Sequence, residues 1–109
     1  MSYVNQFRQY LSAYARKDLQ AIEAMLDEEA TLQDWNLVVN GKLKVLRETQ
    51  NNFEAARSIE IEIKREFVNG RDAAAELHIV IDGTVHLEVV DIVRFNARGL
   101  VESIKSYKG

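Results

Sequence analysis

The spacing of apolar residues changes once along the chain, near Ser58, and this change constrains the fold more than any other feature. Before Ser58 the apolar residues recur every three or four positions, as on the buried face of an amphipathic helix. From Ile59 onward they alternate with charged residues, which is the period of a β-strand. Because helical segments come first and strands follow, we expect an α+β fold.

The first expected helix covers residues 3–16. Ser2 stands at the N-cap position, where its hydroxyl can accept a hydrogen bond from a free backbone N–H. The apolar residues at helical spacing are Tyr3, Val4, Phe7, Tyr10, Leu11 and Tyr14. Both Tyr10 and Tyr14 are therefore expected to point inward.

Two further helices are expected before the period changes. One begins after Asp18 as its N-cap and ends near Glu28, and a short strand follows over residues 30–35. Asn40 and Gly41 then open the next helix. The apolar faces would carry Leu19, Ile22, Met25 and Leu26 in the earlier helix, and Leu43, Leu46 and Phe53 in the later one.

A meander of four strands is expected after the helices, over about residues 58–68, 72–81, 84–95 and 100–107. Asn69-Gly70 and Asp82-Gly83 favour type I′ hairpin turns, because both central residues of such a turn have positive φ. A longer turn covers residues 96–99. One face of the first strand would carry Ile59, Ile61, Ile63 and Phe67. We expect this curved antiparallel sheet to wrap around the helices and enclose one small, mostly apolar pocket.

Composition narrows the classes of function. The 109 residues suffice for one domain, residues 1–109, and for no second core. The net charge is -3 and the basic residues are scattered, so we expect no nucleic-acid partner. No apolar run approaches the roughly 20 residues that span a bilayer, and the N-terminus lacks a secretory layout, so a soluble, cytoplasmic protein without a membrane partner is expected. The absence of cysteine excludes disulfides and thiolate chemistry.

Asp91 is the most informative single residue. On its strand, one face carries Val85, Leu87, Val89, Asp91, Val93 and Phe95, which places a carboxylate within an apolar row. Burial disfavours the ionised form and raises the pKa of such a carboxyl. Asp91 is then either a hydrogen-bond donor in a pocket or a structural acid bonded to the backbone or to an arginine.

The other candidates are less specific. Asp34 ends the short strand, where an aspartate is usually a turn or cap residue. Tyr10 fits a core tyrosine with a satisfied hydroxyl as well as a catalytic one. His78 and His86 share the polar face of the sheet with several charged residues, and two ligands do not make a zinc site, so we expect no metal.

The order of these elements resembles the nuclear transport factor 2-like superfamily, which includes SnoaL-like and ketosteroid isomerase-like proteins. The resemblance covers essentially the whole chain. Two stretches carry it: residues 13–35, AYARKDLQAIEAMLDEEATLQDW, and residues 89–107, VVDIVRFNARGLVESIKSY. It implies a cone-shaped fold in which a curved sheet, mixed or antiparallel, wraps around about three helices.

The resemblance to ketosteroid isomerases implies roles for the three candidates. Asp34 would be the general base, and Tyr10 with a protonated Asp91 would form the oxyanion hole. The chain departs from that pattern at Trp35, where those enzymes commonly have proline, in the short segment 34–41, and at two positions where further tyrosines are replaced, by Leu26 and Thr49.

Two functions remain open from the sequence. The first is an isomerisation or cyclisation without a cofactor, in which Asp34 moves a proton at the carbon α to a carbonyl and Tyr10 with Asp91 stabilises the enolate. The second is a non-catalytic binding or accessory domain with the same pocket. Hydrolysis of an epoxide ranks last, because no Asp-Arg-Asp set is evident.

The expected partners are a small apolar or carbonyl-bearing molecule and a second copy of the chain. The pocket would be lined by Tyr14, Leu26, Trp35, Phe53, Leu77, Val89 and Ile104. A homodimer is expected because the opposite face of the sheet would expose Val68, Val80, Val90 and Ile92 in a monomer.

Overall fold

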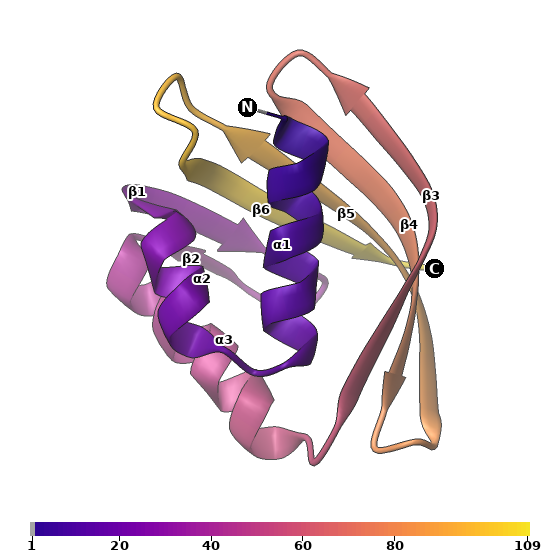
Figure 1. Cartoon of the computed structure of the whole chain (residues 1–109). Coiled ribbons are helices and arrows are strands. Elements are labelled where there is room, and N and C mark those ends of the chain that lie inside the picture. The colour runs from indigo at the N-terminus through magenta and orange to yellow at the C-terminus, as the bar shows by residue number, and fades with distance from the viewer. Residues whose placement is uncertain (1) are drawn as a thin grey trace.

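A computed structural model describes residues 2–109. Three helices and six strands follow one another in the order α1 Tyr3–Ala15, α2 Leu19–Met25, β1 Leu26–Gln33, β2 Val38–Asn40, α3 Lys42–Ala55, β3 Ile59–Asn69, β4 Asp72–Ile81, β5 Val85–Phe95 and β6 Val101–Lys108 (Figure 1). The expected α+β class is confirmed.

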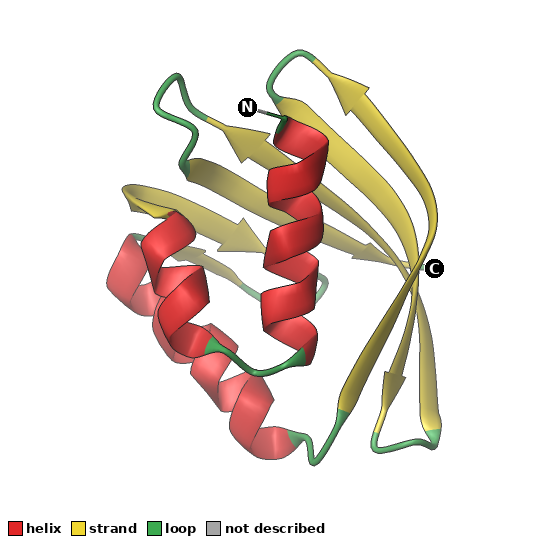
Figure 2. Ribbon diagram, viewed as in Figure 1, coloured by secondary structure: helices red, strands yellow, loops and turns green. Residues whose placement is uncertain are grey.

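All six strands form one curved sheet in the order β2-β1-β6-β5-β4-β3. Neighbouring strands are antiparallel except β1 and β6, which run parallel, so the sheet is mixed. The three helices lie on its concave side (Figure 2). This arrangement leaves the convex side of the sheet without a helix.

Side-chain caps define the starts of the first two helices. The backbone N–H of Asn5 donates to Ser2 Oγ at 3.3 Å, and the N–H of Ala21 donates to Asp18 Oδ1 at 3.1 Å. Each cap satisfies an N–H that has no partner inside its helix. Both predicted N-caps are therefore confirmed.

Two hairpin turns differ although both contain glycine. Asp82 and Gly83 have φ of 56° and 72°, and the Thr84 N–H donates to the Ile81 carbonyl, as in the predicted type I′ turn. In the β3–β4 turn the loop residues are Gly70 and Arg71. Gly70 has φ of 62°, but Arg71 does not have the positive φ that type I′ requires. The type I′ prediction for this turn is wrong, and a type II′ turn fits instead.

The boundary between α2 and β1 lies earlier than the helical spacing indicated. Helix α2 ends at Met25, and Leu26 is already extended, with φ of -88° and ψ of 137°. Leu26 pairs with Val101 of β6, so strand pairing ends the helix before Glu28. The strand expected over residues 30–35 is thus β1, and β2 was not predicted because three residues show no clear period.

The buried face of α3 also differs from the predicted one. Leu43 is 80% exposed, whereas Val45, Thr49 and Phe53 are buried. The threonine fits this apolar face because its hydroxyl donates to the Val45 carbonyl at 2.8 Å. The sequence pattern therefore favoured Leu43 for the buried face, because a buried threonine is not recognised as apolar.

A bulge in β3 reverses the expected orientation of two residues. The pairing with β4 shifts between Ile63 and Arg65, so Arg65 and Phe67 both face outward, with the guanidinium 6.0 Å from the ring centroid. Phe67 is 57% exposed, and Val68 lies opposite the buried Ala73 on the inner side. Phe67 does not share a face with Ile63, and Val68 does not belong to the convex surface.

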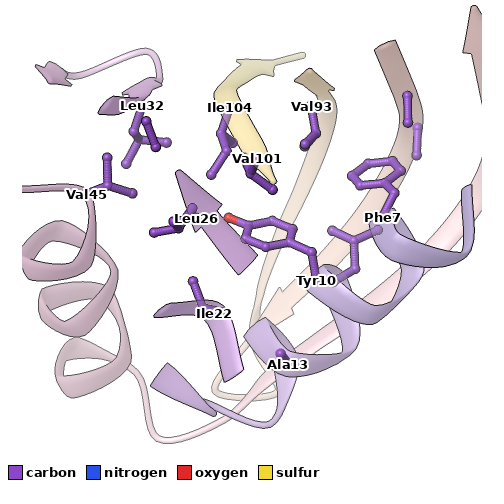
Figure 3. Packing of buried hydrophobic residues seen from close by; sticks show 14 of the residues in the cluster. Phe7, Tyr10, Ala13, Ile22, Leu26, Leu32, Val45, Val93, Val101 and Ile104 are labelled. Atoms are coloured by element: carbon purple, nitrogen blue, oxygen red, sulfur yellow. The ribbon is translucent and has the colours of Figure 1, made fainter. Parts of the chain in front are cut away.

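The hydrophobic core lies between the helices and the concave side of the sheet. Phe7, Ile22, Val45 and Val93 have no exposed surface, and Figure 3 shows them converging from α1, α2, α3 and β5. No helix within residues 2–109 is long and apolar enough to cross a membrane.

Candidate active site

A cavity of about 310 Å³ opens between helices α1 and α3 and the inner face of the sheet. This is roughly twice the size of a cavity of about 150 Å³ that holds benzene, so a two-ring molecule fits it. Its lining consists of Tyr10, Leu11, Tyr14, Leu32, Asp34, Trp35, Asn36, Thr49, Asn52, Ala55, Ala56, Ile59, Ile61, Ile79, Ile81, Leu87, Val89, Asp91, Ile104 and Ser106. Eleven of these twenty side chains are aliphatic, six are polar or acidic and three are aromatic, so the wall is mainly apolar with several polar groups, as in small-molecule sites.

Asp91 points into this cavity from β5 and is only 8% exposed. The Ser106 hydroxyl donates to Asp91 Oδ1 at 2.6 Å from the directly opposite position on β6. Burial raises the pKa of Asp91 to about 6, and the hydrogen bond from Ser106 partly opposes that rise because it stabilises the ionised form. The carboxyl therefore changes charge near neutral pH.

Tyr10 reaches the same cavity from α1. Its hydroxyl extends from the helix toward the sheet in Figure 3, and the residue is 4% exposed. Burial raises the pKa of Tyr10 well above its usual value, with smaller contributions from Tyr14 and from the charge of Asp91. Its hydroxyl has no hydrogen-bond partner among the described residues, so its proton is free for a ligand.

Tyr14 lies one helical turn after Tyr10 and also borders the cavity. The Asn52 side-chain amide donates to the Tyr14 hydroxyl at 2.9 Å, and the ring of Phe53 packs edge-on against the Tyr14 ring with centroids 5.0 Å apart. Burial raises the pKa of Tyr14, the hydrogen bond from Asn52 partly lowers it, and the charges of Asp91 and Asp34 raise it further. Tyr14 thus shares the cavity with both carboxylates.

Asp34 directly follows β1 and forms part of the cavity wall at the end of that strand. Its Oδ1 accepts hydrogen bonds from the backbone N–H groups of Asn36 and Leu37, at 2.7 and 3.0 Å. These two bonds hold the carboxylate in a tight turn of the kind aspartate favours. Oδ2 makes no hydrogen bond within residues 2–109 and is the oxygen available to a ligand.

The structure places the three sequence-predicted residues Asp34, Tyr10 and Asp91 around one cavity, although they come from three different elements. Of the predicted lining residues, Tyr14, Trp35, Val89 and Ile104 border it.

The predicted pocket positions of Leu26, Phe53 and Leu77 are wrong, because all three are core residues outside the lining. Leu26 is buried where β1 meets β6, and Phe53 packs behind Tyr14. Leu77 is fully buried on β4, against which α1 packs. The wall of the cavity lies further along the same strand, at Ile79 and Ile81.

Sequence reasoning missed Ser106. A hairpin closed at residues 96–99 without irregularity would pair Asp91 with Ile104. The loop is one residue longer, and the β5–β6 register shifts again between Arg94 and Phe95, which brings Ser106 opposite Asp91. A bulge has no clear sequence signal, so only the structure reveals this contact.

The convex face carries the two histidines. His78 Nε2 and His86 Nδ1 are 3.0 Å apart with stacked rings, and Glu62 lies 3.6 Å from His78 Nδ1. Within the part of the chain that the structure describes, no group of three or more His, Cys, Asp or Glu residues could hold a metal ion. The pair is separated from the cavity by the sheet itself.

Solved structures with the same fold have diverse assigned activities. A candidate ketosteroid isomerase from Kribbella flavida matches with a TM-score of 0.81 and 19% identity over 94% of this chain and 73% of that one. A candidate SnoaL-like polyketide cyclase from Shewanella denitrificans gives 0.84 and 12%, over 98% and 90% of the two chains. An LEH-like epoxide hydrolase from M. tuberculosis gives 0.80 and 14%, over 98% and 82%.

These identities establish a shared fold and leave the chemistry open. Among curated proteins, none matches this sequence significantly. Among the described residues the cavity lining contains no arginine, so no acid-arginine-acid set borders it. The model of the SnoaL-like domain matches residues 7–104, and the chain therefore belongs to the SnoaL-like domain family.

Proposed function

We propose that the cavity binds a small, apolar carbonyl compound and catalyses proton transfer at the carbon α to the carbonyl, without a cofactor. One observation carries the proposal: Asp34, Tyr10 and Asp91, from three separate elements, border a single apolar cavity. Acidic side chains beside apolar walls lower the stability of the fold unless hydrogen-bond partners compensate them. Incompletely partnered acids in a cavity are therefore typical of functional sites. Here Tyr10 and one oxygen of each carboxylate are left for a ligand.

Each group has a definite step in the proposed reaction. Asp34 Oδ2 takes the proton from the α carbon, and the electrons of that C–H bond form the carbon-carbon double bond of an enolate. The negative charge moves to the carbonyl oxygen, which accepts hydrogen bonds from the Tyr10 hydroxyl and from protonated Asp91. Return of the proton to another carbon gives isomerisation, and attack of the enolate carbon on a second carbonyl gives cyclisation.

The ionisation of Asp91 limits this mechanism to a range of pH. Only protonated Asp91 can donate a hydrogen bond. With a pKa of about 6, Asp91 is protonated in most protein molecules only below pH 6. At pH 7 about one molecule in ten carries the proton, so we expect the rate per enzyme molecule to fall by about tenfold per pH unit above 6. The bond from Ser106 sets this limit lower than burial alone would.

Hydrogen–deuterium exchange tests the reaction without knowledge of the natural substrate. Wild-type protein in D₂O should accelerate exchange at the α carbons of 2-tetralone, a two-ring ketone that matches the cavity, as followed by proton NMR. Asp34→Asn should lower the protein-dependent rate by about 100-fold or more, as expected for loss of a general base. Tyr10→Phe should lower it by about tenfold or more, since one donor to the enolate oxygen is lost.

Glu23→Gln is the matched control, because it neutralises an exposed carboxylate on α2 outside the cavity. It should exchange 2-tetralone at the wild-type rate. Exchange at the buffer rate with wild-type protein, or equal rates in the Asp34→Asn and wild-type proteins, would refute the proposed proton transfer.

A non-catalytic ligand-binding domain is the second candidate. It is favoured by the partners that both carboxylates already have, Ser106 for Asp91 and the backbone N–H groups after Asp34. Saturable binding of 2-naphthol, measured by calorimetry, together with no acceleration of exchange would select this alternative.

A further inference from the structure

The polar groups of the cavity lie at two depths. Tyr10 and Asp91 are buried, at 4% and 8% exposure, and Ser106 is bonded to Asp91. Tyr14 is partly exposed and is bonded to Asn52, which lies on the exposed side of α3. Tyr10 and Asp91 are thus more deeply buried than Tyr14 and Asn52.

The Tyr14 hydroxyl is able to donate a hydrogen bond to a ligand. It receives the hydrogen bond from Asn52, so one of its lone pairs is occupied and its own hydrogen remains. That hydrogen has no acceptor among residues 2–109. A hydroxyl that accepts a hydrogen bond is also a better donor, because each bond polarises the next.

Packing fixes where this donor points. The Tyr14 ring lies at 75° to the ring of Phe53 and at 55° to that of Tyr10, with centroids 5.0 and 6.1 Å away. These contacts hold the ring at the cavity wall. The nearby Thr49 hydroxyl cannot serve in its place, because it donates to the carbonyl of Val45 within its own helix.

We infer that Tyr14, supported by Asn52, forms a second polar subsite, which binds a second oxygen acceptor on the substrate. This inference rests on the proposed function, because the first oxygen is the carbonyl bound by Tyr10 and Asp91. The substrate class is then an apolar carbonyl compound with a further carbonyl, ester or ether oxygen. The aliphatic wall of the same cavity, which includes Ile61, Ile79 and Leu87, accommodates the hydrocarbon part.

Matched phenols test this subsite because they resemble an enolate at one end and differ only at the other. The pairs are 4-methoxyphenol with 4-ethylphenol, and 6-methoxy-2-naphthol with 6-ethyl-2-naphthol. Within each pair the shape is similar, and only the methoxyl accepts a hydrogen bond. Calorimetric titration gives the ratio of the two dissociation constants for each protein variant.

Wild-type protein should bind the methoxyl compound about five times more tightly than the ethyl compound in at least one pair, as expected for one hydrogen bond. Tyr14→Phe should reduce that ratio to within about twofold of unity, and Asn52→Ala should reduce it partly. Tyr10→Phe should weaken both compounds and preserve the ratio. Gln50→Ala, an exposed neighbour on α3 outside the cavity lining, should change neither value.

A ratio near unity in both pairs, or a ratio that Tyr14→Phe leaves unchanged, would overturn the second subsite. If binding still weakens in Tyr10→Phe, that result would leave the proposed function standing. Failure of all four compounds to bind would overturn the proposed function and the subsite together.

Discussion

The two faces of β5 carry acidic residues in opposite circumstances. On the inner face, Asp91 lies between Val89 and Val93 with one hydrogen-bond partner and a pKa raised to about 6. On the outer face, Glu88 lies 3.5 Å from Lys64 in contact with solvent. Exposed ion pairs contribute little to stability, whereas an acid in an apolar cavity costs stability when it ionises. Substitutions on the outer face of β5 should therefore change stability less than substitutions on its inner face.

The largest difference between the inner and outer faces of the whole sheet should appear on truncation of an apolar side chain. Leu77→Ala removes a side chain with no exposed surface and should lower the free energy of unfolding by about 2 to 5 kcal/mol. Val90→Ala on the outer face, 40% exposed, should change it by less than about 1 kcal/mol. Urea denaturation of both variants measures this, and equal effects would contradict the assignment of the two faces.

Asp91→Asn should change the dependence of stability on pH. Because the folded-state pKa of about 6 lies above the usual 3.8, the folded protein binds more protons than the unfolded chain between about pH 4 and 6. Its contribution to the free energy of unfolding therefore falls as the pH rises through this window, by up to about 3 kcal/mol.

The difference in stability between wild type and Asp91→Asn should shift by most of that amount between pH 4 and pH 7 and change little above pH 7. Comparison with the variant is needed because Asp27 and Asp82, whose pKa values are lowered by hydrogen bonds from Glu29 and Ser58, give the opposite trend. A constant difference across this range would show that Asp91 ionises normally.

Ser106→Ala should produce a smaller change with the same origin. Loss of its hydroxyl removes the hydrogen bond that favours ionised Asp91, so the pKa of Asp91 should rise further. NMR titration of the Asp91 carboxyl carbon should show a midpoint at higher pH than in wild type. A lower or unchanged midpoint would mean that Ser106 does not stabilise the carboxylate.

The smallest effect on the protomer is expected from a substitution on the convex face, which should change only the oligomeric state. It exposes Phe67, Val90 and Tyr107 among charges of both signs, a composition that a twofold interface can match with itself. We expect a homodimer at micromolar concentration in sedimentation, and a monomer with an unchanged circular dichroism spectrum for Val90→Lys. A monomeric wild-type protein would contradict this expectation.

Much of the fold could be predicted because local patterns determine it. Helix α1 was recognised from its apolar spacing and Ser2, and the three long strands β3, β4 and β5 from alternation and turns. Long-range pairing was not accessible in the same way. Leu26 belongs to a strand because it pairs with Val101, a residue far along the chain, and this contact overrides a helical pattern.

The site was predictable in its residues and less so in its contacts. Asp91 was evident because a charge interrupts an apolar row, and its inward position needs only the strand period. The bulges in β3 and between β5 and β6 shifted the register, so the faces of Phe67 and Val68 and the partner of Asp91 could not be obtained from alternation alone. The Asn52 contact to Tyr14 depends on how α1 and α3 pack.

The parallel pairing of β1 with β6 also has a consequence for folding. Because β6 is the final strand in sequence and lies between β1 and β5, strands β1 and β2 cannot join the rest of the sheet until residues 101–108 are available. Contacts between segments so distant in sequence are formed slowly, since a long loop must close first. A nascent chain would carry β3, β4 and β5 as an open hairpin array, exposed to aggregation, until β6 arrives and the cavity acquires Ile104 and Ser106.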